Sequence, residues 1–228
     1  MLFGVNINYS DLKNNDFNKL VSIAEKADIN SVTVKLTNES DLDEAVFQVL
    51  SNAKGIKLNL EIPILKEFRQ FALKLRPHAC YIAPEKIHEN TSLNGVNVAG
   101  QLPRIISFVG PLFLTGINTG ILVSPDTEQI QAAANTGVRL IELHASSYFN
   151  SIGTDNEKSE FDKLKSATEF AQRLNLNVRL GRGLNYRNIS KIKEITAISE
   201  LNIGHAFALR ALSVGFDTAA FELKELIG

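Results

Sequence analysis

Short apolar runs typical of β-strands alternate with amphipathic runs typical of α-helices along the whole sequence. Strands are predicted at Leu2–Asn8, Ser31–Leu36, Ile56–Ile62, Ala79–Ala83, Thr119–Ser124, Arg139–His144, Asn177–Gly181 and Glu200–Gly204. Helices are predicted at Asp16–Ala27, Asp41–Asn52, Ile64–Leu75, Gln101–Val109, Asp126–Asn135, Glu157–Leu174, Asn188–Thr196 and Phe207–Ile227. This alternation over 228 residues predicts an α/β protein with a single domain at 1–228, a (β/α)8 TIM barrel. An open doubly wound sheet is the alternative.

Polar residues alternate with apolar residues in part of each of the first three predicted strands. The set consists of Asn6, Asn8, Thr33, Lys35, Asn59 and Glu61. Successive side chains of a strand point to opposite faces, and the outer face of a barrel strand packs against helices. We therefore expect the polar set to point into the barrel, toward the carboxyl ends of the strands, where this fold places active sites. A structural Lys35–Glu61 ion pair is the alternative to a polar cavity.

Glycine-containing turns follow the last two predicted strands. Gly181 and Gly183 flank Arg182 in "VRLGRGLN", and Gly204 precedes His205 in "LNIGHAF". Many barrels bind phosphate with these two loops, through backbone N–H groups and a helix N-terminus. Phosphate binding by the backbone of Gly181, Gly183 and Gly204 is therefore predicted, although the glycines could serve only as turn residues. His205 could donate to the anion or cap the last helix.

Ionisable side chains at the ends of predicted strands supply candidate catalytic groups. Glu61 could act as a general base if its pKa is raised. Lys35 could hold a phosphate, or attack a carbonyl carbon if desolvation lowers its pKa. His144 follows Glu142 by two positions and could share the same cavity. The four histidines show no metal-ligand spacing, so no metal site is expected.

Charge and cysteine content narrow the expected partners and compartment. The chain has 24 Lys plus Arg against 25 Asp plus Glu, a formal net charge of −1. Without a basic excess, neither nucleic acid nor an anionic membrane is an expected partner. The apolar stretch "IISFVGPLFLTGI" is too short to span a bilayer, and the start of the chain does not have the pattern of a signal peptide. The lone Cys80 suits a reducing compartment, so we expect a cytoplasmic protein.

Several motifs occur together in a fixed order: "GVNIN", "LNLEI", "PEK", "NVAGQ", "IELHA", "GRGLNY" and "ELNIGHA". In this combination the chain resembles the pyridoxine 5′-phosphate synthase family over nearly its whole length. The resemblance implies a (β/α)8 barrel with additional helices that forms homo-oligomers, an octamer or smaller, and uses no metal or organic cofactor. It implies a condensation of two small phosphorylated substrates, 1-deoxy-D-xylulose 5-phosphate and 3-amino-2-oxopropyl phosphate.

At some of the family's functional positions, this chain has the same type of residue. The catalytic glutamate of the family matches Glu61. A threonine that contacts the sugar phosphate matches Thr91 in "ENTSLNG". The groups that hold the phosphate of the aminoketone match Asn6, Gly183, Gly204 and His205.

Other family positions are substituted in this chain. The family has Asp-His where Asn8 and Tyr9 stand, histidine at Lys35, and arginine at Thr37. A proton-donating histidine of the family is replaced by Arg182, whose guanidinium stays protonated at ordinary pH. Most substitutions fall on the sugar-phosphate side of the expected site, whereas the aminoketone-phosphate side is largely kept.

These substitutions leave three hypotheses about function. In a divergent synthase, Glu61 would remain the base while Lys35 and Arg182 carry substrate charge. In a paralogous enzyme, Lys35 would form a Schiff base with another phosphorylated carbonyl compound. In a non-catalytic protein, the glycine loops would bind a phosphorylated ligand without turnover.

Overall fold

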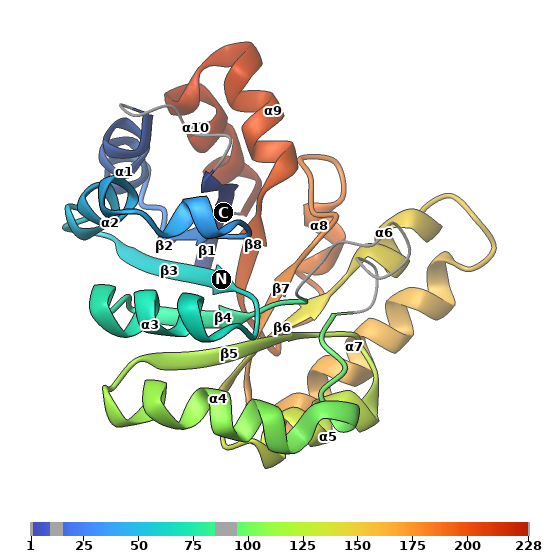
Figure 1. Ribbon diagram of the computed structural model, residues 1–228. Coiled ribbons are helices and arrows are strands. Elements are labelled where there is room, and N and C mark those ends of the chain that lie inside the picture. Colours follow the sequence, from blue (N-terminus) through green and yellow to red (C-terminus); the bar gives the residue numbers. More distant parts are fainter. Residues whose placement is uncertain (1, 10–15, 85–94, 228) are drawn as a thin grey trace.

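Parallel β-strands close into a barrel in the computed structural model, which describes residues 2–9, 16–84 and 95–227 (Figure 1). The strands are β1 (Leu2–Asn8), β2 (Ser31–Lys35), β3 (Lys57–Ile62), β4 (Ala79–Ile82), β5 (Asn118–Val123), β6 (Leu140–His144), β7 (Asn177–Gly181) and β8 (Ile198–Ile203). Each strand pairs with the next in parallel, and β8 pairs with β1. The predicted (β/α)8 barrel is therefore confirmed, and the open doubly wound sheet is wrong.

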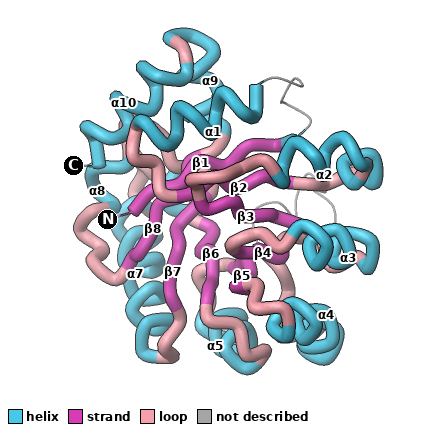
Figure 2. The backbone as a smooth tube through the Cα atoms, turned by 90° about the vertical axis from the view of Figure 1, so that its left-hand side faces the viewer, coloured by secondary structure: helices cyan, strands magenta, loops and turns pink. Residues whose placement is uncertain are grey.

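Helices surround the strands, which occupy the centre of the molecule (Figure 2). They are α1 (Asp16–Lys26), α2 (Glu44–Ser51), α3 (Lys66–Leu75), α4 (Leu102–Leu114), α5 (Thr127–Asn135), α6 (Ser146–Ser151), α7 (Glu157–Arg173), α8 (Ile189–Ile192), α9 (His205–Val214) and α10 (Phe216–Ile227). Short 3-10 segments, Glu39–Leu42 and Ala99–Gln101, precede α2 and α4. The sequence pattern missed α6. Among the described residues, no helix has both the length and the apolar character needed to cross a bilayer.

Strand alternation separates an apolar outer layer from a polar interior. Val32 and Val34 of β2 are fully buried, whereas Thr33 between them accepts a hydrogen bond from Arg179 on β7. Asn6 of β1 likewise donates across the barrel to Glu61 of β3. The predicted inward direction of the polar positions is therefore confirmed for these strands.

Helix α4 continues to Leu114, beyond its predicted end at Val109 and through Pro111. Proline removes the N–H group that would bond the carbonyl oxygen four residues earlier. That carbonyl belongs to Ser107, and Arg69 of α3 donates to it at 3.1 Å. A side chain from the neighbouring helix thus satisfies the group that proline leaves free.

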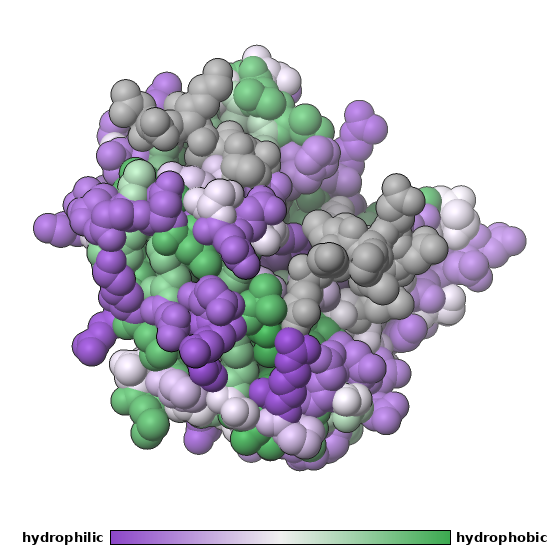
Figure 3. Space-filling model, viewed as in Figure 1, coloured by the Kyte–Doolittle hydropathy of each residue, from purple (hydrophilic) through white to green (hydrophobic). Residues whose placement is uncertain are grey.

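The predicted helix Phe207–Ile227 is wrong, because the chain forms α9 and α10 instead. Gly215 separates them with a φ of +86°, a value that favours glycine. The predicted helix Asn188–Thr196 is also too long, since only Ile189–Ile192 is α-helical. Hydrophobic side chains remain exposed on α9, where Leu212 is 85% exposed. Figure 3 shows hydrophobic residues in green at the top of the molecule, where Figure 1 places this helix.

Candidate functional site

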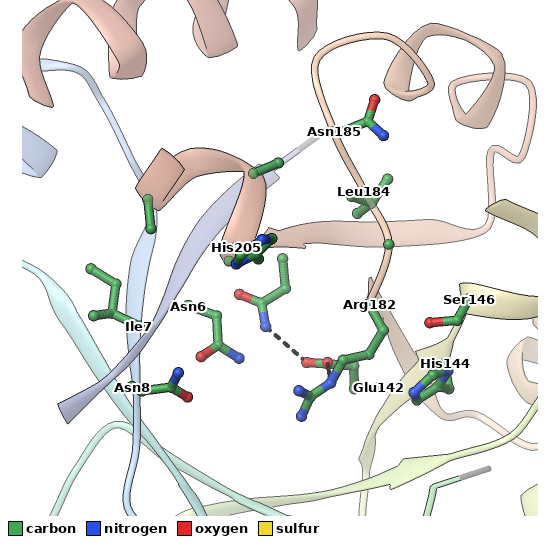
Figure 4. A pocket seen from close by; sticks show the side chains of 15 residues that line it. Asn6, Ile7, Asn8, Glu142, His144, Ser146, Arg182, Leu184, Asn185 and His205 are labelled. Carbon is green, nitrogen blue, oxygen red and sulfur yellow. Dashed lines mark hydrogen bonds and ion pairs between the residues drawn. The ribbon is translucent and has the colours of Figure 1, made fainter. Parts of the chain in front are cut away.

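A cavity of about 450 Å³ lies at the carboxyl ends of β1, β6, β7 and β8 (Figure 4). Its lining includes Asn6, Asn8, Glu142, His144, Ser146, Arg182, Gly183, Asn185, Asn202, Gly204 and His205. Parallel strands bring residues distant in sequence to the same end of the barrel. The expectation that His144 shares a cavity with Glu142 is confirmed, and the loops after β7 and β8 meet there as predicted.

Glu61, at the end of β3, is 1% exposed and is surrounded by donors. Asn6 Nδ2 donates to its Oε2 at 3.0 Å, and Lys35 Nζ lies 3.5 Å from its Oε1. Arg182 also donates to Oε1 in a short ion pair. Burial alone would raise the pKa of this carboxyl group, but the charges of Arg182 and Lys35 and the hydrogen bonds from Arg182 and Asn6 lower it to about 2. In this arrangement Glu61 is therefore a charged partner and a weak base.

The predicted Lys35–Glu61 ion pair is present, but it is one part of a larger network. Lys35 and Glu61 line a small hollow of about 10 Å³ together with Thr37. Arg182 contacts Glu61 and also lines the large cavity. The guanidinium group thus connects the carboxylate of β3 with the space between the two glycine loops.

Arg182 adopts a left-handed backbone conformation, with a φ of +67°. Residues other than glycine rarely adopt this conformation, and it often marks functional sites. Its Nε lies 3.7 Å from Glu142 Oε1, so the side chain faces two carboxylates. Figure 4 shows the side chain reaching from the loop after β7 to the floor of the cavity beside Glu142.

Glu142 is a second buried carboxylate, at 1% exposure, whose partners the sequence did not indicate. Arg179 Nε donates to its Oε2 at 2.6 Å, and Asn202 Nδ2 donates to the same oxygen at 3.0 Å. Gly181 leaves room for this carboxylate, since a Cβ there would lie 2.3 Å from Oε1. The one available sequence signal was the position of Arg179 between the apolar residues of β7.

Arg179 is the largest fully buried side chain among the residues that the structure describes. Its guanidinium group also donates to Thr33 Oγ1 at 2.9 Å and lies 3.5 Å from the ring centroid of Tyr81. A buried charge is tolerated when it is paired and hydrogen-bonded in this way. This arginine therefore fixes Glu142 from below while leaving the cavity open above.

The two predicted phosphate loops form opposite parts of the cavity lining. Gly183 has a φ of +92°, and a Cβ at this position would lie 2.6 Å from the ring of Phe149. Gly204 immediately precedes α9, which begins at His205, earlier than the predicted start at Phe207. The positive end of a helix and its free N–H groups favour an anion at such a position. The structure thus brings together Asn6, Gly183, Gly204 and His205, the residues expected to hold one phosphate.

The residues expected on the sugar-phosphate side are placed differently. Asn8 lines the cavity, whereas Thr37 lies beside the small hollow. The backbone N–H groups of Thr37 and Asn38 donate to Asp41 Oδ2 at 2.8 and 2.9 Å, so an internal carboxylate occupies them. Burial, followed by the charges of Asp43 and Asp41, raises the pKa of Tyr9.

Thr91 lies outside the described residues. The described part of the chain contains no group of three or more His, Cys, Asp or Glu residues arranged to hold a metal ion.

The chain is similar in sequence to known proteins of one family. The family model described as "Pyridoxal phosphate biosynthesis protein PdxJ" matches residues 8–228. A protein named pyridoxine 5′-phosphate synthase from Synechococcus sp. is 35% identical over 207 residues, covering 90% of this chain and 87% of that protein. A protein of the same name from Idiomarina loihiensis is 33% identical over 210 residues, covering 90% and 86%.

Solved structures at low identity share the fold. Tryptophan synthase subunit alpha from Legionella pneumophila has a TM-score of 0.70 at 10% identity, covering 99% of this chain and 92% of that chain. A mutant alpha-subunit from Pyrococcus furiosus also has a TM-score of 0.70 at 10% identity, covering 100% and 98%. These likenesses concern the barrel alone, whereas the family match spans both glycine loops and Glu61. The chain belongs to the pyridoxal phosphate biosynthesis protein PdxJ family.

Proposed function

We propose that this protein is a pyridoxine 5′-phosphate synthase that condenses 1-deoxy-D-xylulose 5-phosphate with 3-amino-2-oxopropyl phosphate. The observation that carries the proposal is the meeting of Glu61, Arg182 and two glycine loops at one end of a barrel of this family. The active unit is proposed to be the single domain formed by residues 1–228.

The glycine loops supply the phosphate side of the proposed site. Gly183 and the N-terminus of α9 at His205 offer backbone N–H groups and a favourable helix dipole. Asn6 approaches from β1, where its carbonyl oxygen would lie 3.1 Å from a Cβ on Gly204. The phosphate of the aminoketone is proposed to bind here, with Asn8 and Tyr9 facing the second substrate.

Glu61 is the proposed general base, and Lys35 and Arg182 are the proposed carriers of substrate charge. A base needs a pKa near the working pH to remove protons efficiently. In the arrangement described above, the pKa of Glu61 is lowered to about 2 by its cationic neighbours. Catalysis therefore requires a change in the partners of Glu61 when substrates bind.

The decisive experiment is turnover by the purified protein with both substrates, followed by mass spectrometry of the product. Formation of pyridoxine 5′-phosphate that is abolished by Glu61→Gln supports the proposal. No product at high protein concentration, with a folded protein and authentic substrates, overturns it.

Two controls in the same assay separate the other hypotheses. Borohydride reduction in the presence of each substrate would label Lys35 if this residue formed a Schiff base, and the 3.5 Å ion pair of Lys35 with Glu61 favours a structural role instead. Thermal stabilisation by phosphorylated ligands without product would indicate a binding protein.

We also propose that the protein is cytoplasmic and forms homo-oligomers, an octamer or smaller. Exposed hydrophobic side chains on several helices support self-association: Leu114 on α4 is 90% exposed, and Phe221 on α10 is 62% exposed. Sedimentation analysis of the purified protein tests the oligomeric state. A monomer at all concentrations contradicts this part of the proposal.

A further inference from the structure

Arg182 lies between the buried carboxylate of Glu61 and the large cavity. Its guanidinium group is ion-paired with Glu61 on one side, and its side chain lines the large cavity on the other. The side chain is 25% exposed, whereas that of Glu61 is 2% exposed. An anion entering the cavity therefore reaches Arg182 before it reaches Glu61.

The lining of the cavity favours an acidic group close to the guanidinium group of Arg182. Gly183, the next residue along the chain, and Gly204 both line it. Arginine offers five N–H donors in a planar fork that matches the oxygens of a phosphate or carboxylate group. An acidic ligand between the two glycines thus competes with Glu61 for the same donors.

We propose that Arg182 is a ligand-operated positioning residue: an acidic group bound between Gly183 and Gly204 takes over its guanidinium and releases Glu61. This inference rests on the proposed function for the role of Glu61 as a base, but the exchange of partners stands on the geometry alone. The ligand class is a small molecule with a phosphate group.

The exchange changes the surroundings of Glu61 in a defined way. Before binding, Glu61 has Asn6 from β1, Lys35 from β2 and Arg182 from the loop after β7. After the exchange it keeps Asn6 and Lys35. Loss of one cation from beside a buried carboxylate favours its protonated form and makes it a stronger base.

Other charged or titratable groups lie around this cluster and stay in place. Glu142 of β6 holds Arg179 of β7, and Tyr81 of β4 packs under that arginine. The Arg182 Nε remains 3.7 Å from Glu142 Oε1, which gives the side chain a second anchor during the exchange. The switch therefore involves one contact, between Arg182 and Glu61.

The test is a double-mutant cycle on the binding of inorganic phosphate, measured by isothermal titration calorimetry. It uses the intact protein and the variants Glu61→Gln, Arg182→Gln and the double substitution. If Glu61 competes with phosphate for Arg182, then Glu61→Gln tightens binding by about tenfold, within the range of roughly 5- to 150-fold that is usual for coupled sites.

The same substitution made in the Arg182→Gln background separates competition from simple charge. Removing the negative charge of Glu61 weakens the repulsion of anions in the cavity, whether or not Arg182 is present. Salt screens this general effect. If Glu61 and phosphate compete for Arg182, then Glu61→Gln should raise phosphate affinity by less than about twofold in the Arg182→Gln variant, because the guanidinium group for which they compete is absent. An equal gain in both backgrounds, or no gain from Glu61→Gln, overturns the proposal.

A variant that fails to fold and a protein that binds no phosphate are the two remaining outcomes. If Arg182→Gln does not fold, Arg182→Lys replaces it, and the gain from Glu61→Gln must then shrink because lysine lacks the planar fork. Absence of phosphate binding in every folded variant also overturns the proposal. Failure of the protein to make pyridoxine 5′-phosphate would reject the proposed function but leave this binding result standing.

Discussion

Replacing the buried Arg179 with methionine should cause a large loss of stability. Arg179 is 2% exposed and donates to Glu142 Oε2 at 2.6 Å and to Thr33 Oγ1 at 2.9 Å. Its removal leaves the carboxylate of Glu142 buried, with Asn202 as a neutral donor and Arg182 3.7 Å away. Breaking a buried ion pair in this way costs about 3–5 kcal/mol of unfolding free energy.

The loss can be measured by urea unfolding at neutral pH. With an m value of about 3 kcal/mol/M, it lowers the midpoint by about 1 to 1.7 M urea. The second substitution Glu142→Gln removes the stranded charge, so the double variant should be more stable than Arg179→Met alone. Lys74→Met is the matched control, because Lys74 pairs with Glu44 on the surface, 2.9 Å away, and its loss should leave the midpoint unchanged.

Two outcomes of these urea measurements count against the assigned role of Arg179. A deficit below about 1 kcal/mol, or one that Glu142→Gln does not reduce, would refute the reasoning.

Other predictions concern single contacts. Gly183→Ala should cost roughly 1–3 kcal/mol and weaken phosphate binding, because its φ is +92° and the new Cβ meets Phe149; unchanged calorimetric affinity would contradict this. Asp43→Ala should cost about 1 kcal/mol in urea unfolding, since Asp43 caps α2 by accepting from the Val46 N–H at 2.8 Å, and an unchanged midpoint would count against that role. Burial raises the pKa of Cys80 to about 12, so its thiol should resist iodoacetamide at roughly pH 8 in the native protein and react in urea. Fast labelling of the native protein, seen by mass spectrometry, would show that this thiol is accessible.

Sequence patterns predicted the ends of helices well where the deciding contact lies within the same helix or strand. They failed where the end depends on a side chain from another helix. The start of α2 is a near miss: the pattern predicted a helix from Asp41, whereas α2 begins at Glu44, capped by Asp43 after a 3-10 turn. The end of α4 depended on Arg69 of another helix, which satisfies the carbonyl group opposite Pro111. The break at Gly215 was visible in the sequence as a glycine, but the pattern did not show that it would end a helix.

By itself, the sequence determined the barrel and the direction of its side chains. Alternation with a period of two is a property of each strand, so the inward placement of Asn6, Thr33 and Glu61 followed before any contact was known. The glycines after β7 and β8 likewise marked the two loops that line the cavity.

Only the tertiary structure decided which charges meet inside the barrel. Arg182 reaches Glu61 across 121 positions of sequence, and Arg179 reaches Thr33 across 146. These contacts depend on the register of eight strands and on closure of β8 against β1, which no single segment encodes. The interior of a barrel excludes most water, so each buried charge must find its partner there, and that pairing left Glu61 bound to Arg182.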